Sequence, residues 1–222
     1  NVPMLFAIGF IFTFIHGGLT GLFLGNVTVD LPLSDTYFVV GHFHMVMGVS
    51  PILVVFGAIY HWYPKISGRM WNERLGKAHF WLTFLGTYAI YLPMHYLGIL
   101  GVPRRYYALG DTAFIPDSVH SINAAITIAA LIVAAAQVIF LYNMIVSLKK
   151  GAKAPPNPWK ATTLEWQTPD TPPHHGNWGP KLPVVHRWAY DYSVPGAKDD
   201  FIPQNEPVDP KLGAGRDHGK KH

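Results

Sequence analysis

Apolar residues along the chain fall into four long runs, at about residues 4–25, 36–62, 79–101 and 119–147. Each run reaches the roughly 20 residues that an α-helix needs to cross a bilayer. A soluble helical core is the competing interpretation, but four such runs so close together are not expected of one. The pattern therefore predicts an all-α protein, a polytopic transmembrane helix bundle with four spans over residues 1–153.

The composition changes after residue 153. Residues 154–222 are rich in Pro, Gly, His and charged side chains and show no apolar period. Such a composition is typical of an extended segment rather than of a separate folded core. We expect a Pro-rich tail that lies on the rest of the protein, with the segment NPWKATTLEW packed against the loops.

Charged residues indicate how the predicted spans are oriented. The loop YPKISGRMWNERLGK holds four basic residues against one acid, and SLKKGAK adds three lysines after the last run. By the positive-inside rule both segments, and with them the tail, are cytoplasmic. The formal net charge of +4 is explained by this topology, so we expect a lipid membrane and no nucleic acid as a partner.

The overall composition supports the membrane interpretation. Half of the residues are hydrophobic and 14% are charged, against about a quarter charged in typical soluble domains. The chain has no cysteine, which excludes thiolate metal sites and disulfides. It begins at Asn1 without a basic segment before the first apolar run, so we expect no signal peptide and a chain cut from a longer protein.

Two histidines, His42 and His44, lie inside the second apolar run, in the stretch YFVVGHFHMVMG. Helical residues two apart point about 200° away from each other. The pair is therefore poorly placed to hold one metal ion and well placed to serve two separate sites, with Phe43 between them. Ionisable residues within a membrane are functional by default, and haem iron is a natural partner for an axial imidazole.

The alternative is that these histidines only hydrogen-bond neighbouring helices. We expect that simpler role for the other histidines of the apolar runs: His16, His79 and His95.

Arg104 and Arg105 lie in the outer loop VPRRYYALGDTAFIPD, where the positive-inside rule disfavours them. Guanidinium groups suit bidentate carboxylate binding, and a haem carries two propionates. The other outer loop ends at Asp35, seven residues before His42, which is about 10 Å along a helix axis. Propionates pointing outward would then meet both loops. The alternative for the arginines is contact with lipid headgroups.

The stretches DTYFVVGHFHMVMG and GVPRRY resemble subunit I of the haem-copper terminal oxidases, of the cytochrome c oxidase type. The similarity covers all four runs and continues into the tail, where NPWKATTLEWQTPDTPPHHG resembles the bacterial form. It implies that the chain is the last third of that subunit, its ninth to twelfth helices. It also implies a location in the bacterial inner membrane. It also implies reduction of oxygen to water with electrons from cytochrome c, coupled to proton pumping.

The resemblance assigns a cofactor to each histidine of the pair. His42 matches the proximal ligand of the high-spin haem that binds oxygen, and His44 matches an axial ligand of the low-spin haem, both of the a type. Phe43 lies between them, where an electron passes from one haem to the other. The copper ligands, the second axial histidine and the proton channels belong to other helices. The expected partners are therefore the rest of subunit I, the other oxidase subunits and cytochrome c.

The same resemblance assigns roles at the outer surface. Arg104 and Arg105 match the pair that holds the haem propionates, and Asp30 matches an acid beside them. Asp35 matches a ligand of a magnesium or manganese ion. The family usually has a second ligand, His, where this chain has Ser34. A hydroxyl is a weaker ligand, so we expect an ion, if one is bound, to be held mainly by Asp35.

Two other functions are compatible with the pattern. A nitric oxide reductase keeps a His-x-His helix, and a non-catalytic helix bundle could use the histidines only as bridges between helices. The PRRY loop and the TLEW segment favour the oxidase. The haem subtype and the electron donor, cytochrome c or quinol, stay open.

Overall fold

The computed structural model of the protein describes residues 1–106, 116, 118–173, 178–192, 194–197 and 199–207. These residues form helices, and they contain no strand beyond isolated bridges. They divide into two compact units, Asn1–His61 with Trp71–Lys150, and Trp62–Met70 with Gly151–His222. The prediction of an all-α protein is confirmed for the described part of the chain.

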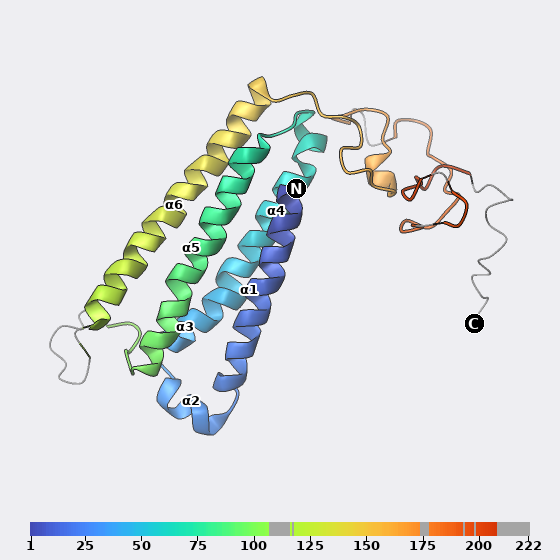
Figure 1. The fold of residues 1–222 in the computed structure, drawn as a ribbon. Helices are drawn as coiled ribbons and strands as arrows, with labels where there is room; N and C mark the ends of the chain where they lie inside the picture. The colour runs from blue at the N-terminus through green and yellow to red at the C-terminus, as the bar shows by residue number, and fades with distance from the viewer. Residues whose placement is uncertain (107–115, 117, 174–177, 193, 198, 208–222) are drawn as a thin grey trace, which may run out of the picture. The chain divides into compact units, whose positions relative to one another are not determined.

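The first unit is built from long helices that lie side by side (Figure 1). They are α1 (Val2–Leu24), α5 (Glu73–Ile99), α6 (Ser118–Lys150) and a continuous helical segment made of α3 (Tyr37–Phe43), the π-helix η1 (His44–Val49) and α4 (Ser50–Ser67). Helix α5 packs along both α6 and α3. Each of the four predicted apolar runs is thus helical.

One helix was not expected. The loop between the first two runs contains α2 (Val27–Leu33), which lies at one end of the first unit in Figure 1. Its N-cap is Asn26, whose side-chain oxygen accepts hydrogen bonds from the N–H groups of Thr28 and Val29. Such a cap satisfies N–H groups that have no partner within the helix. Seven residues are too few to show an apolar period, so the pattern missed this helix.

The second span changes its winding just before Pro51. Proline has no N–H to donate to the carbonyl of Met47, and its ring crowds that carbonyl. Here the π-helix η1 precedes Pro51, and the Ser50 hydroxyl donates to the carbonyl of Met45 at 2.6 Å. The π-helix therefore lies beside the proline that interrupts the hydrogen bonding of the α-helix, and both features are established causes of helix kinks.

Three helical segments of the described chain are long and apolar enough to cross a membrane: Val2–Leu24, Tyr37–Ser67 and Ser118–Lys150. Helix α5 is not among them, so the prediction of four spans is not confirmed. The reason is its polar content, because histidine, threonine, tyrosine and glycine residues interrupt its apolar run and lower the mean hydropathy.

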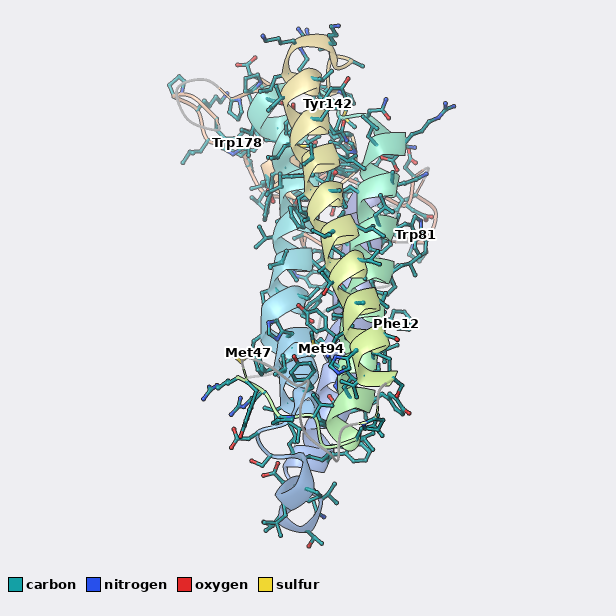
Figure 2. The ribbon with its side chains drawn as sticks, turned by 90° about the vertical axis from the view of Figure 1, so that its left-hand side faces the viewer. Phe12, Met47, Trp81, Met94, Tyr142 and Trp178 are labelled. Carbon is teal, nitrogen blue, oxygen red and sulfur yellow. The ribbon has the colours of Figure 1, made fainter. Side chains whose placement is uncertain are left out.

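Large apolar side chains point away from the interior of the first unit. Figure 2 shows Phe12, Trp81 and Tyr142 along the helices, and these side chains are 61%, 48% and 58% exposed. Extended apolar surfaces of this kind are rare on soluble monomers. They are the surfaces that lipid or neighbouring helices cover in a membrane protein.

The interior is partly polar, and its polar groups are paired across helices. The Tyr60 hydroxyl donates to His79 Nδ1 at 3.1 Å, and His79 Nε2 donates to the Gln137 side-chain oxygen at 3.2 Å. The Gln137 amide in turn donates to the Thr83 hydroxyl at 3.1 Å. His79 is fully buried and links α4, α5 and α6, which agrees with the structural role that the sequence predicted for it.

The second unit joins the tail to Trp62–Met70, which includes the last turns of α4. The ammonium group of Lys65 donates to the Glu165 carbonyl and to the Thr168 hydroxyl, and it lies 5.3 Å from the centre of the Trp166 ring. Trp166 is 2% exposed. The tail segment around TLEW therefore packs against the last turns of α4, where the sequence predicted a loop.

Helix α5 approaches α3 most closely at Gly98, which suggests a stability test. A Cβ atom at Gly98 would lie 2.1 Å from the backbone nitrogen of Phe38, so Gly98→Ala must push the two helices apart. Overpacking of this kind typically costs about 1–3 kcal/mol. We expect a lower midpoint of thermal unfolding for the purified protein that carries this change.

Gly18→Ala is the matched control, because a Cβ at Gly18 would meet no atom within 4 Å. Alanine is the better helix former by about 1 kcal/mol, so this variant should unfold no earlier than the wild type. Equal midpoints for the two variants would contradict the close contact between α3 and α5.

Candidate functional site

His42 lies in α3 and contacts α1. Its Nδ1 is 2.8 Å from the carbonyl oxygen of Gly17 and 3.2 Å from the hydroxyl oxygen of Thr20. A Cβ atom at Gly21 would lie 2.8 Å from His42 Cε1. Because a carbonyl oxygen only accepts hydrogen bonds, Nδ1 carries the proton, and Nε2 of the neutral ring keeps its lone pair.

Two glycines of α1 allow the second span to approach closely. Gly17 and Gly21 face the second span. A Cβ atom added at Gly17 would lie 2.6 Å from Val46, and one added at Gly21 would lie 2.8 Å from His42. The hydroxyl of Thr20 donates to the Gly17 carbonyl at 2.8 Å. Gly18 faces open space instead, so it takes no part in the contact.

His44 is the first residue of η1, and its ring faces a different helix. Its Nδ1 is 2.9 Å from the carbonyl oxygen of Val40. The ring stacks on Tyr91 of α5, with 5.0 Å between ring centres and 16° between planes. Because this partner is also a carbonyl oxygen, which only accepts hydrogen bonds, Nδ1 carries the proton and Nε2 keeps its lone pair. The two histidines thus contact α1 and α5, as their helical spacing predicted.

The arrangement provides two separate imidazole ligands. Neither Nε2 has a hydrogen bond in the described chain, and an Nδ1–H bonded to a carbonyl is the usual support of a metal-ligating histidine. The described residues contain no group of three or more His, Cys, Asp or Glu side chains able to hold an ion. The donor set therefore fits two metals that each take a single axial imidazole, as haem iron does.

Phe43 lies between the two histidines in sequence and is 36% exposed. Its ring centre is 4.4 Å from that of His44, with the planes inclined by 32°. Sequence reasoning missed Tyr91, the aromatic residue on the other side of His44. No local signal identifies it, because it comes from a different helix and enters the site only through tertiary packing.

The acidic and basic candidates lie at the end of the first unit where α2 and α3 meet. Arg104 donates from Nε and Nη2 to the same oxygen of Asp35, at 2.9 and 2.6 Å. The sequence assigned these two residues to different ligands and did not predict their pairing. Asp30 lies in α2 and is half-buried, and its backbone carbonyl accepts a hydrogen bond from the N–H of Ser34. Arg105 is exposed.

Comparison with known proteins identifies the family. The family described as "Cytochrome C and Quinol oxidase polypeptide I" matches residues 1–132. The chain belongs to this family. It is 71% identical over 214 residues to the alternative cytochrome c oxidase subunit 1 of Bradyrhizobium diazoefficiens, an alignment that covers 96% of the chain and 36% of that protein.

Two further relatives agree with this assignment. The chain is 46% identical over 194 residues to cytochrome c oxidase subunit 1 of Synechocystis sp., covering 87% of the chain and 34% of that protein. A cryo-EM structure of a heme-copper terminal oxidase dimer has the same fold over 69% of the chain and 28% of its own, with a TM-score of 0.59 and 20% identity.

The chain spans about a third of the length of the curated relatives that it matches. That share agrees with the predicted size of the segment. It does not confirm that the segment is the last third of the subunit.

The fit between His42 and α1 leads to a prediction for this haem-copper oxidase subunit. Gly21→Ala places a methyl group 2.8 Å from His42 Cε1, so the ring must turn and its Nδ1–H loses the Gly17 carbonyl. We expect an altered haem absorption spectrum of the purified complex. Gly18→Ala, one turn away on the open face of α1, should leave the spectrum unchanged. The same spectrum in all three proteins would show that His42 does not depend on this contact.

Proposed function

We propose that the chain is part of the catalytic subunit of a terminal respiratory oxidase. In this proposal it takes part in the reduction of oxygen to water, with electrons from cytochrome c and with coupled proton translocation. The observation that carries the proposal is the pair of imidazoles on one helical segment of a haem-copper oxidase family member. Each has its Nδ1–H held by a carbonyl and its Nε2 lone pair free.

In this proposal His42 ligates the high-spin haem and His44 the low-spin haem. When bound, these groups supply the redox and oxygen chemistry. The chain supplies the orientation, because the Gly17 carbonyl fixes the plane and tautomer of His42, and the stacked ring of Tyr91 fixes the plane of His44. Donation from Nδ1–H to a carbonyl also makes Nε2 a stronger ligand. Phe43 lies between the two sites.

The arginines are proposed to bind the propionates. A guanidinium group has five N–H donors, and the two that Arg104 gives to Asp35 leave three for a carboxylate. Arg105 is exposed beside it, and Asp30 lies in α2 at the same end of the unit. The copper of the oxygen-reducing site takes its ligands from outside this chain.

Helix α5 is proposed to be the fourth span. Its 27 residues are about 40 Å long at 1.5 Å per residue, which exceeds the roughly 30 Å of a hydrocarbon core. It packs along α6 and α3, so its polar side chains are covered by protein. The basic segment at residues 63–77 and the lysines at the end of α6 favour a cytoplasmic tail in a bacterial inner membrane. The proposed partners are the rest of subunit I and the other oxidase subunits.

Separate loss of the two histidines tests the proposal. His42→Gly should remove the high-spin haem or its carbon monoxide spectrum, and His44→Gly should disturb the low-spin bands, because the two rings serve different sites. Added imidazole should restore part of the lost signal in each variant, since a small ligand can occupy the space of the missing ring.

Three outcomes would contradict the proposal. Identical losses confined to one haem in both variants would show that the rings share a site. A purified wild-type complex without haem bands would support the non-catalytic helix bundle. Non-haem iron in place of copper would identify a nitric oxide reductase instead.

A further inference from the structure

The ion pair between Asp35 and Arg104 joins two loops of the first unit. Two donors of one guanidinium group, Nε and Nη2, bind the single oxygen Oδ1 of Asp35. The backbone repeats the connection, because the N–H of Arg104 donates to the Asp35 carbonyl at 2.9 Å and the N–H of Tyr37 donates to the Val102 carbonyl at 3.0 Å. Side chain and main chain therefore hold the same two segments together.

The backbone on both sides of this pair has an uncommon conformation. Asp35 has φ of 60° and Arg105 has φ of 66°, a left-handed region that side chains other than glycine rarely adopt. The conformation is held by Thr36, which is buried, pairs with Pro103 and donates from its hydroxyl to the Leu33 carbonyl at 2.6 Å. Rare backbone angles persist only where the surroundings determine them, so the direction of the Asp35 carboxylate is built into the fold.

A divalent cation does not fit these residues. Magnesium prefers six oxygen ligands at about 2.0–2.1 Å, and the residue beside Asp35, Ser34, offers only an exposed neutral hydroxyl. The oxygen Oδ1 of Asp35 already accepts two guanidinium donors. An ion at this carboxylate would lie beside the positive charge of Arg104, and the repulsion between the two cations opposes its binding.

The pair is better suited to holding the arginine. The Arg104 side chain is 23% exposed and that of Asp35 is 75% exposed, so the carboxylate lies on the outer side of the guanidinium group. Two bonds from Nε and Nη2 fix the plane of the group and leave three N–H donors in set directions. We propose that Asp35 is a positioning residue that orients Arg104 and that it does not ligate a resident divalent cation. The role of Arg104 in this statement rests on the proposed function.

The first experiment examines the metal and does not depend on haem. The oxidase complex is purified from cells grown with excess manganese, treated with a chelator, and measured by electron paramagnetic resonance. We expect no bound Mn²⁺ signal that depends on Asp35, so the spectra of wild type, Asp35→Asn and Ser34→Ala should agree. A tightly bound Mn²⁺ signal that is present in the wild type and lost in Asp35→Asn would overturn the proposal.

The second experiment examines the arginine through the haem midpoint potentials. Asparagine adopts left-handed angles readily and has the shape of aspartate, so Asp35→Asn removes the charge and spares the loop. Arg104→Lys keeps the charge but lacks the planar fork. We expect each change to shift a haem midpoint potential, and the double variant to shift it no further than Arg104→Lys alone.

Additive shifts in the double variant would overturn the positioning role, because they would show that Asp35 acts on the haem directly. Ser34→Ala should leave the potentials unchanged, since Ser34 has no part in the pair. Absence of haem from the wild-type complex would defeat the proposed function instead, and the manganese experiment would still decide whether Asp35 binds an ion.

Discussion

The close approach of helices at glycine residues is the constraint on which the candidate site depends. Gly17 and Gly21 of α1 lie against the second span, and Gly98 of α5 lies against the backbone of Phe38. In a bilayer no hydrophobic effect drives helices together, so small residues and van der Waals contact have to do so. The close approach of α1 and the second span places the carbonyl oxygen of Gly17 2.8 Å from His42 Nδ1.

The imidazole orientations follow from that packing. A histidine in an apolar environment loses its hydrogen bonds to water, so one ring nitrogen needs a partner inside the protein. In His42 and His44 that nitrogen is Nδ1, and the partner is a carbonyl. The partner sets the tautomer, and the tautomer decides which nitrogen can bind a metal. The same logic gives His79 a different outcome, because both of its nitrogens are bonded to side chains and none is free.

At the end of the first unit where α2 and α3 meet, Asp35 has Arg104 as its charged partner, and its neighbour in sequence, Ser34, is a neutral hydroxyl. A carboxylate with one cationic partner has less capacity for a second. The ion pair and the two backbone hydrogen bonds between the loops together hold the guanidinium group in place.

The sequence by itself determined the helical class, the place of each long helix and the residues of the histidine pair. These features depend on local properties, namely apolar runs of sufficient length, the angle between successive helical residues, and a stretch of small residues. The family resemblance followed from the same local motifs. The π-helix lies next to Pro51, whose missing N–H is also visible in the sequence.

Only the tertiary structure decided which groups meet. Tyr91 stacks on His44 across 47 positions of the chain, and Arg104 binds Asp35 across 69. Neither pair has a local signal, because both depend on how α5 and its loop pack against α3. The short helix α2 and the polar content of α5 were misjudged for a related reason. Seven residues are too few for a period, and a threonine or histidine can be polar in sequence and still be buried and paired within a bundle.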